Sequence, residues 1–279
     1  MPVFRHWKGL LAAGLAALVG GTACWARFGE TSRLVLRREE VALPAAARPF
    51  TVALFSDIHL GRYGGAQLLR RVAALIGDQQ PDLVVFAGDF FDAYRRDQEL
   101  LDLDELAAIL AGIEAPFGKY AVWGNHDRGG GAHRVYGELM EQGGFALLQN
   151  QAVALPDLGL VLGGLDDALL GRPDFSLSLE GEGLRVLVAH EPGPAAEQVP
   201  GAHLILSGHT HGGQLGLPLV RRLLLPPGSG SYAKGSYPLG EGRFLQVTSG
   251  VGVTKVPARL FDPPEVVLLQ IVPGQKGPS

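Results

Sequence analysis

The chain has 279 residues, of which 47% are hydrophobic and 19% are charged, so it is long and apolar enough to bury a large core. Its formal net charge is −4 and it has no basic stripe, which argues against nucleic acid as a partner. Cys24 is the only cysteine, which excludes an internal disulfide and a cysteine-based zinc site. Any metal ion must therefore be bound by His, Asp, Glu or Asn side chains.

An uncharged stretch at residues 9–26 lies between basic residues near the N-terminus. It is just long enough to cross a bilayer, and the small residues at 20–23 also fit the end of a signal peptide. We expect residues 1–27 to be a signal peptide or membrane anchor, because four glycines and a basic flank suit a buried core helix less well. Counting Lys and Arg favours a cytoplasmic C-terminal side, whereas a cleaved or start-type signal would export it, so both sides stay open.

Residues 28–49 predict a linker that includes an edge strand over 31–41. From residue 50 onward, short apolar runs alternate with helix-like stretches, a pattern typical of parallel strands in βαβ units. Strands are expected over 50–55, 83–87 and 119–123, and helices over 66–77 and 102–113. No second domain boundary is visible, so residues 50–279 predict one large domain.

The second half has further apolar runs with little helix between them. They lie at 146–148, 152–155, 160–163, 184–189, 204–206, 243–248 and 266–271. This order predicts an α/β protein in which helices lie outside a pair of mixed sheets. Residues 217–238 contain four prolines and predict a long irregular insertion or lid. The leucines at its start, with Arg221 and Arg222, fit either a segment that dips into a membrane surface or a part of the core.

Polar residues of a restricted kind follow five of these apolar runs. They are Asp57 and His59, Asp89 and Asp92, Asn125 to Asp127, His190, and His209 and His211. Ligands of open α/β sheets bind at the carboxyl ends of strands, so we expect these side chains to share one crevice. In the pairs Asp57/His59 and His209/His211, extended backbone would point both members the same way. Such ligands suit Mn, Fe or Zn, and a carboxylate between two cations suits a two-metal site.

These five motifs, in this order and spacing, resemble those of the calcineurin-like metallophosphoesterases. The longer run from Gly208 to Gln214 (GHTHGGQ) is similar to the membrane-associated bacterial subgroup, which includes exported phosphodiesterases and some UDP-2,3-diacylglucosamine hydrolases. The resemblance implies a β-sandwich of two mixed sheets flanked by helices, with residues 50–279 as the catalytic domain. It also implies an N-terminal anchor of the same kind.

The resemblance further implies a centre of two divalent metal ions. The first ion would be bound by Asp57, His59, His211 and the bridging Asp89. The second would be bound by Asp89, Asn125, His190 and His209. His126 would not be a ligand but would protonate the leaving oxygen, Asp127 would orient its ring, and Asp92 would lie behind the ligands. The remaining histidines, His6, His133 and His203, are expected to be structural or on the surface.

The implied function is a dinuclear-metal-dependent phosphoesterase, in which hydroxide supplied by the two cations attacks phosphorus. The expected substrate is a phosphodiester or pyrophosphate of the membrane or envelope, which includes lipid-linked phosphates. Alternatives are a phosphomonoesterase on the same site and a non-catalytic scaffold of this fold, which the complete set of motif residues disfavours. Candidate substrate contacts near the crevice are Arg62, Tyr63, Arg128, Arg259 and the 217–238 segment. For Arg62 and Arg128, ordinary surface charge is the alternative. The sequence indicates neither the metal nor the oligomeric state.

Overall fold

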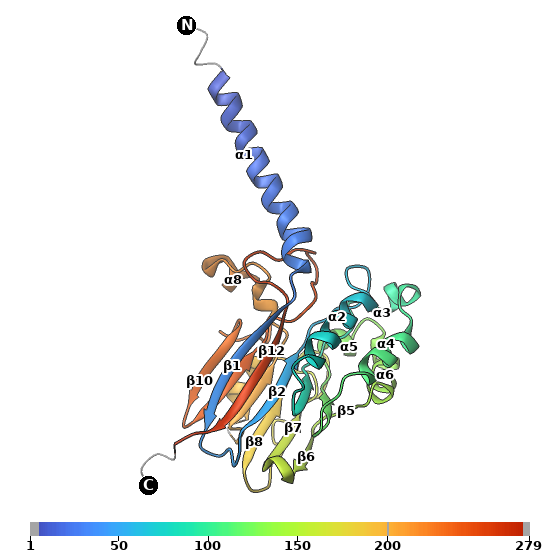
Figure 1. Ribbon diagram of the computed structural model, residues 1–279, viewed down its shortest axis with the longest axis vertical. Coiled ribbons are helices and arrows are strands. Elements are labelled where there is room, and N and C mark those ends of the chain that lie inside the picture. The colour runs from blue at the N-terminus through green and yellow to red at the C-terminus, as the bar shows by residue number, and fades with distance from the viewer. Residues whose placement is uncertain (1–5, 200, 276–279) are drawn as a thin grey trace.

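Two six-stranded sheets form the centre of the computed structural model, which describes residues 6–199 and 201–275 (Figure 1). The first sheet has the order β1 (Val35–Leu43), β12 (Glu265–Pro273), β2 (Phe50–Phe55), β3 (Leu83–Phe86), β4 (Lys119–Ala121), β5 (Phe145–Leu147). The second has the order β10 (Gly235–Gly240), β11 (Arg243–Val247), β9 (Leu204–Ser207), β8 (Leu184–Val188), β7 (Leu160–Gly164), β6 (Gln151–Leu155). Parallel and antiparallel pairs occur in both sheets, which confirms the two mixed sheets.

Strand β2 shows how the sequence builds the layers. All of its side chains except that of Thr51 are buried, because successive residues point to opposite faces and both faces are covered. Val52 and Leu54 pack between the two sheets, whereas Ala53 and Phe55 pack under the helices. Each fully buried Leu or Phe side chain contributes about 1.5–3 kcal/mol to folding. The strands therefore read as nearly continuous apolar runs.

Helices cover the outer face of each sheet, as the sequence predicts. The first sheet is covered by α2 (Ala66–Gly77), α4 (Leu103–Ala111) and α6 (Tyr136–Gln142), whose apolar sides join one core cluster with Phe55 and Phe86. The outer face of the second sheet packs against α7 (Pro192–Gln198). Short helices and turns complete the chain: α3 (Tyr94–Asp97), α5 (Asn125–Arg128), η2 (Trp25–Gly29), η3 (Glu30–Ser32), η4 (Gln98–Leu100), η5 (Ala132–Arg134), η6 (Pro156–Leu158), η7 (His211–Gly213). The layers are α/β/β/α.

The segment 217–238 is more regular than predicted. It contains α8 (Pro218–Leu224) and the start of strand β10, so the prediction of an irregular insertion holds only for the residues between them. Pro218 occupies the first turn of α8, where its missing N–H costs no hydrogen bond. Pro238 lies in β10, an edge strand, which tolerates proline for the same reason. The number of prolines in this segment therefore does not indicate an irregular backbone.

The first described element, α1 (His6–Cys24), projects away from the sheets (Figure 1). A stretch at Gly9–Ser32 that includes most of it has a mean hydropathy of 1.6, and only 6% of its most apolar window is buried. Length and composition would allow it to cross a membrane. A core helix would be buried, so this alternative is excluded for the folded chain.

Candidate metal centre

Loops at the carboxyl ends of β2, β3, β4, β8 and β9 carry the five polar motifs. Five predicted ligands have left-handed backbone, with φ between 50° and 69°: Asp57, His59, Asp89, His209 and His211. Non-glycine residues rarely adopt such angles, and those that do cluster at functional sites. The expectation of extended pairs is therefore wrong. Asp57 and His59 join one cluster, but His209 and His211 turn into two different ones.

Backbone N–H groups hold both carboxylates so that one oxygen of each faces the histidines. Asp57 Oδ2 accepts a hydrogen bond from the N–H of His209 at 3.0 Å, and Asp57 Oδ1 has no partner among the described residues. Asp89 Oδ1 accepts from the N–H of His126 at 2.8 Å. Only glycine fits at position 124, because a Cβ there would lie 2.2 Å from Asp89 Oδ1. These contacts fix the two carboxylates before any ion binds.

The first cluster brings together residues of the first and the last of the five motifs: Asp57, His59 and His211. His59 Nε2 and His211 Nε2 lie 3.0 Å apart, and Asp57 Oδ1 lies 3.4 Å from His211 Nε2. The Nδ1 atoms of both rings are buried without a hydrogen-bond partner in the described part of the chain. A cation bound by the two Nε2 atoms and Asp57 Oδ1 would explain why these three atoms lie so close together.

In the second cluster, carbonyl groups fix the histidine tautomers. His190 Nδ1 lies 2.6 Å from the Ala87 carbonyl oxygen, and His209 Nε2 lies 2.6 Å from that of Pro227. A carbonyl only accepts, so the proton is on those nitrogens and the lone pairs are on His190 Nε2 and His209 Nδ1, which lie 3.2 Å apart. Both lone pairs are thus available to a metal ion.

One atom of Asp89 borders both clusters. Its Oδ2 lies 3.2 Å from His190 Nε2 and 3.6 Å from His59 Nε2. A single carboxylate oxygen between two sets of imidazoles is the arrangement of a site for two cations. The residues present therefore fit two divalent ions, with Asp89 between them.

Electrostatics favour the same occupant. Burial raises the pKa of Asp57 to about 6, and it lowers the pKa of His59 to about 3 and that of His209 to about 4. Burial also raises the pKa of Asp89, but the neighbouring His190 more than offsets this, so it lies well below the ordinary value. At neutral pH the metal-free centre therefore offers ionised carboxylates and neutral rings at His59, His209 and His211, the forms in which these groups bind metals. Burial also lowers the pKa of His190, but Asp89 more than offsets this and holds it well above the ordinary value, so a cation must displace a proton from that ring.

The third motif lies on α5, against Asp89. Asn125 Oδ1 is buried without a hydrogen-bond partner among the described residues, which leaves it free for an ion. The ring of His126 is the most exposed of the site, with 26% of its side chain accessible, and its Nδ1 lies 2.6 Å from the Asp92 carbonyl oxygen. Its proton is therefore on Nδ1, and Nε2 is free to face a substrate.

Asp127 does not orient the ring of His126 as expected. Its carboxylate accepts hydrogen bonds from the N–H groups of Asp89, Phe90, Phe91 and Gly124 at 2.8–3.3 Å. Asp127 therefore joins the loop after β3 to the loop after β4. The Asp92 carbonyl holds the ring in its place, because the short α5 helix directs Asp127 inward and His126 outward. Asp92 lies behind His59, with Oδ1 3.7 Å from His59 Nδ1.

The predicted substrate contacts lie in different surroundings. Arg62 and Tyr63 are exposed on the loop after His59. The Arg128 Nε donates to Asp166 at 2.8 Å, and its guanidinium lies 4.0 Å from the centre of the Trp123 ring. Arg259 is fully buried and meets no substrate, because it binds backbone carbonyls of its own loop. These belong to Ser249, Gly250, Gly252 and Asp262.

Two of the remaining histidines lie outside the centre, as predicted. His133 is exposed, and His203 Nδ1 accepts from the N–H of Arg185 at 3.0 Å. The side chain of His6 lies outside the described residues.

The sequence reading missed two supporting residues, Gln214 and Thr254. The Gln214 amide donates to the Val256 carbonyl at 2.8 Å and accepts from the N–H of Thr254 at 3.1 Å. The Thr254 hydroxyl donates to Asp92 Oδ1 at 3.3 Å. Gln214 thus fastens the 254–258 loop beside the metal centre. Gln214 is the last residue of the GHTHGGQ run, so this run contains a signal for the supporting residue as well as for the family.

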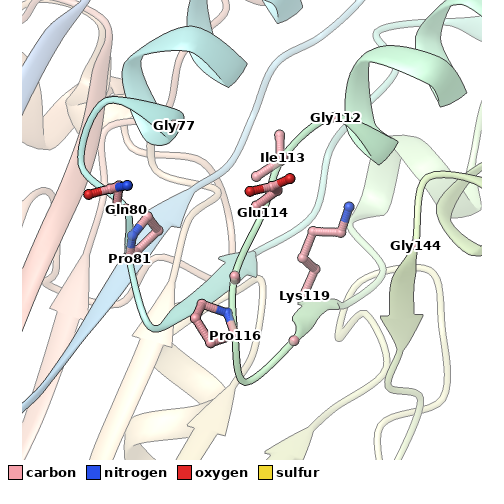
Figure 2. A pocket seen from close by; sticks show the side chains of 11 residues that line it. Gly77, Gln80, Pro81, Gly112, Ile113, Glu114, Pro116, Lys119 and Gly144 are labelled. Atoms are coloured by element: carbon pink, nitrogen blue, oxygen red, sulfur yellow. The ribbon is translucent and has the colours of Figure 1, made fainter.

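A cavity of about 630 Å³ lies at the other ends of β3 and β4, away from the centre (Figure 2). Its walls include Pro81, Glu114 and Lys119. The Lys119 ammonium is bound by the carbonyls of Leu110 and Gly143 at 2.8 and 2.7 Å. The Lys119 ammonium thus binds the carboxyl ends of two helices, so this cavity has no free ammonium group to offer a phosphate.

Comparisons with known proteins agree with this geometry. The sequence profile of the calcineurin-like phosphoesterase family matches residues 50–213. The uncharacterized metallophosphoesterase YkuE of Bacillus subtilis (strain 168) is 35% identical over 276 residues, 94% of each chain. The phosphodiesterase YaeI of Escherichia coli (strain K12) is 32% identical over 233 residues, 81% of this chain and 83% of that one.

A Danio rerio transmembrane protein with metallophosphoesterase domain is 30% identical over 242 residues, 80% of this chain and 53% of that protein. The family profile covers more than half of this chain, and the Bacillus relative covers nearly all of it. The clustered carboxylates and imidazoles supply the ligands that such hydrolases need. The chain therefore belongs to the calcineurin-like phosphoesterase family and is a metal-dependent phosphoester hydrolase.

Proposed function

We propose that the chain is a dinuclear-metal phosphodiesterase that hydrolyses phosphodiester or pyrophosphate bonds of a membrane- or envelope-associated substrate. The observation that carries this proposal is the position of Asp89 Oδ2 between the two ligand clusters. Its proposed ligands are the seven that the sequence predicts: Asp57, His59, Asp89, Asn125, His190, His209 and His211. Two bound divalent cations supply a nucleophile from water near neutral pH and neutralise phosphate oxygens. Mn, Fe and Zn all fit this donor set.

His126 is the proposed proton donor to the leaving oxygen. Burial lowers its pKa, but Asp89, the Asp92 carbonyl and other acidic neighbours raise it, so it lies above the ordinary 6.5 in the metal-free protein. The protonated imidazole is thus available at neutral pH, and a positioned acid contributes about 10²–10⁴-fold. Asp127 and Asp92 act through position, by holding the α5 loop and the His126 ring.

We also propose that residues 1–27 anchor the catalytic domain, residues 50–279, to a membrane. The exposed apolar helix α1 supports this, and one relative is named a transmembrane protein. Thr31, just after the apolar segment, and His59 line one small cavity, so the metal centre lies at the anchored end of the domain.

Activity on two chromogenic esters tests the proposal. The full chain, loaded with Mn²⁺, is expected to hydrolyse bis-p-nitrophenyl phosphate, and to lose this activity after chelation. Cleavage of p-nitrophenyl phosphate alone would support the phosphomonoesterase alternative instead. Absence of turnover of either ester with two metal ions bound per chain would overturn the enzymatic proposal for simple esters.

Metal removal is expected to lower stability as well. Each ion at about 100 times its Kd would add about 2.7 kcal/mol, which for a chain of this size is a shift in Tm of roughly 5–10 °C per ion. The physical reason is that Asp57 Oδ1 and Asn125 Oδ1 are buried without hydrogen-bond partners among the described residues, and the Nε2 atoms of His59 and His211 face each other at 3.0 Å. Calorimetry with and without chelator measures the shift, and an unchanged Tm would contradict the two-ion centre.

Acid is expected to weaken metal binding. Because burial raises the pKa of Asp57 to about 6, this carboxyl is protonated below that pH and a cation must displace the proton. The apparent metal affinity should therefore fall as pH drops through 6. Isothermal titration with Mn²⁺ across this range measures it. A fall that begins only below pH 4 would show that burial does not raise the pKa of Asp57.

A further inference from the structure

A second cavity, of about 210 Å³, lies directly beside the metal centre. Its walls are mostly apolar, and they include Leu215, Leu224, Pro226, Val256 and Ala258. The wall also contains the exposed Lys255, whereas Arg259, which is buried nearby, is already bound by carbonyl groups and the Gln214 amide is bound by the loop backbone. Apart from Lys255, the cavity therefore offers apolar contact and little hydrogen bonding.

The cavity shares parts of its wall with the metal centre. His211, whose Nε2 belongs to the first ligand cluster, forms one part. Thr254 forms another, and its hydroxyl reaches Asp92, whose carbonyl holds the ring of His126. A phosphate bound at the centre would thus lie next to the cavity.

The surface beside the cavity is exposed and apolar, and part of it is close to α1. Val256, in the cavity wall, is 62% exposed, and Leu223 and Phe261, outside the wall, are 85% and 66% exposed. Phe261 and Leu260 line a shallow hollow together with Leu18 and Trp25 of the N-terminal helical segment. Lys255, Arg221 and Arg222 lie among these apolar residues. Apolar side chains with basic neighbours are typical of segments that rest in the headgroup region of a membrane.

From this placement we infer that the cavity binds one acyl chain of the substrate, so that the protein hydrolyses phosphodiesters of single-chain or diacyl lipids presented by a membrane. The inference rests on the proposed function and specifies its substrate class. A volume of 210 Å³ equals about seven water molecules at about 30 Å³ each, which is space for the first part of one chain and not for two. The phosphate would lie at the metal centre and the remaining hydrocarbon would stay in the bilayer.

A series of soluble diesters tests the inference. The full chain is purified in digitonin, a detergent without an alkyl chain, and loaded with Mn²⁺. The substrates are p-nitrophenyl methyl, butyl, hexyl and octyl phosphate. Burial of each methylene should raise kcat/KM by about fourfold until the cavity is full. The increase in kcat/KM should come mainly from a lower KM, because the alkyl chain binds far from the reacting oxygen.

Three variants locate the effect. Leu224→Asp places a charge on the cavity wall at a half-exposed position, and Ala258→Trp fills the cavity with apolar volume, so a folding defect in one leaves the other informative. Both should flatten the dependence on chain length. Leu223→Asp is the matched control, because Leu223 is adjacent in α8 but does not line the cavity. It should keep the wild-type dependence.

The outcomes separate the inference from the proposed function. A flat chain-length profile in the wild type, with all esters hydrolysed, would overturn the acyl-chain inference and leave the phosphodiesterase intact. Equal flattening by Leu223→Asp would also overturn it, because the effect would then not belong to the cavity. Absence of turnover of every ester, including the methyl ester, would instead overturn the proposed function.

Discussion

Asp89→Asn is expected to lower kcat/KM on a phosphodiester by about 10³-fold or more and to leave fewer than two metal ions bound per chain. Asp89 Oδ2 is the atom that borders both ligand clusters, and an amide in its place has no negative charge to hold two cations together. The hydrogen bond from the His126 N–H to Oδ1 can persist in Asn, so the loop should keep its shape. Steady-state kinetics and elemental analysis of the purified variant measure both effects.

Asp82→Asn is the matched control for this variant. Asp82 lies at the opposite end of β3, where its Oδ2 accepts from the N–H and hydroxyl of Thr51 at 2.7 and 2.9 Å. The Asp82→Asn substitution should lower the free energy of unfolding slightly, and the variant should keep two bound metal ions and normal turnover. If Asp89→Asn kept two ions and about a tenth of the activity, the bridging position of Asp89 would not be what the metals require.

His126→Ala is expected to keep both metal ions and to lose about 10²–10⁴-fold in kcat. Among the described residues, the one hydrogen bond of the His126 ring is that of Nδ1 with the Asp92 carbonyl, so the ring can act on a substrate through Nε2. Metal content, measured beside kcat, separates an acid from a ligand. Metal loss in proportion to the loss of activity would show that His126 is a ligand.

The pH dependence gives a second test of this role. The pKa of His126 lies above its ordinary value, so the protonated acid is present below that pKa and is lost as pH rises through it. Wild-type kcat should therefore fall on the alkaline side, and His126→Ala should lack this fall. His133→Ala, a change at an exposed histidine outside the centre, should keep the wild-type profile. An alkaline fall that persists in His126→Ala would assign it to another group.

The sequence determined the layers and the chemistry of this protein. Apolar runs of three to six residues marked β2, β3 and β9 to within one residue, because strands buried on both faces need continuous apolar side chains. The polar residues after those runs could only meet at one edge, because parallel strands bring their carboxyl ends together. The ligand types then followed from a chain whose only cysteine is Cys24.

The resemblance to the calcineurin-like family already implied which ligands share an ion, but only the tertiary structure shows the contacts that bring them together. His59 and His211 meet across 152 residues, and His190 is oriented by a carbonyl 103 residues away, so no local period could predict either contact. Left-handed backbone at His209 and His211 sends two histidines of one motif into different clusters. Arg259 is buried away from any substrate, and the Asp127 carboxylate is bound by backbone N–H groups rather than by the ring of His126. Side-chain roles of this kind depend on dihedral angles and distant neighbours, which hydrophobic periodicity does not encode.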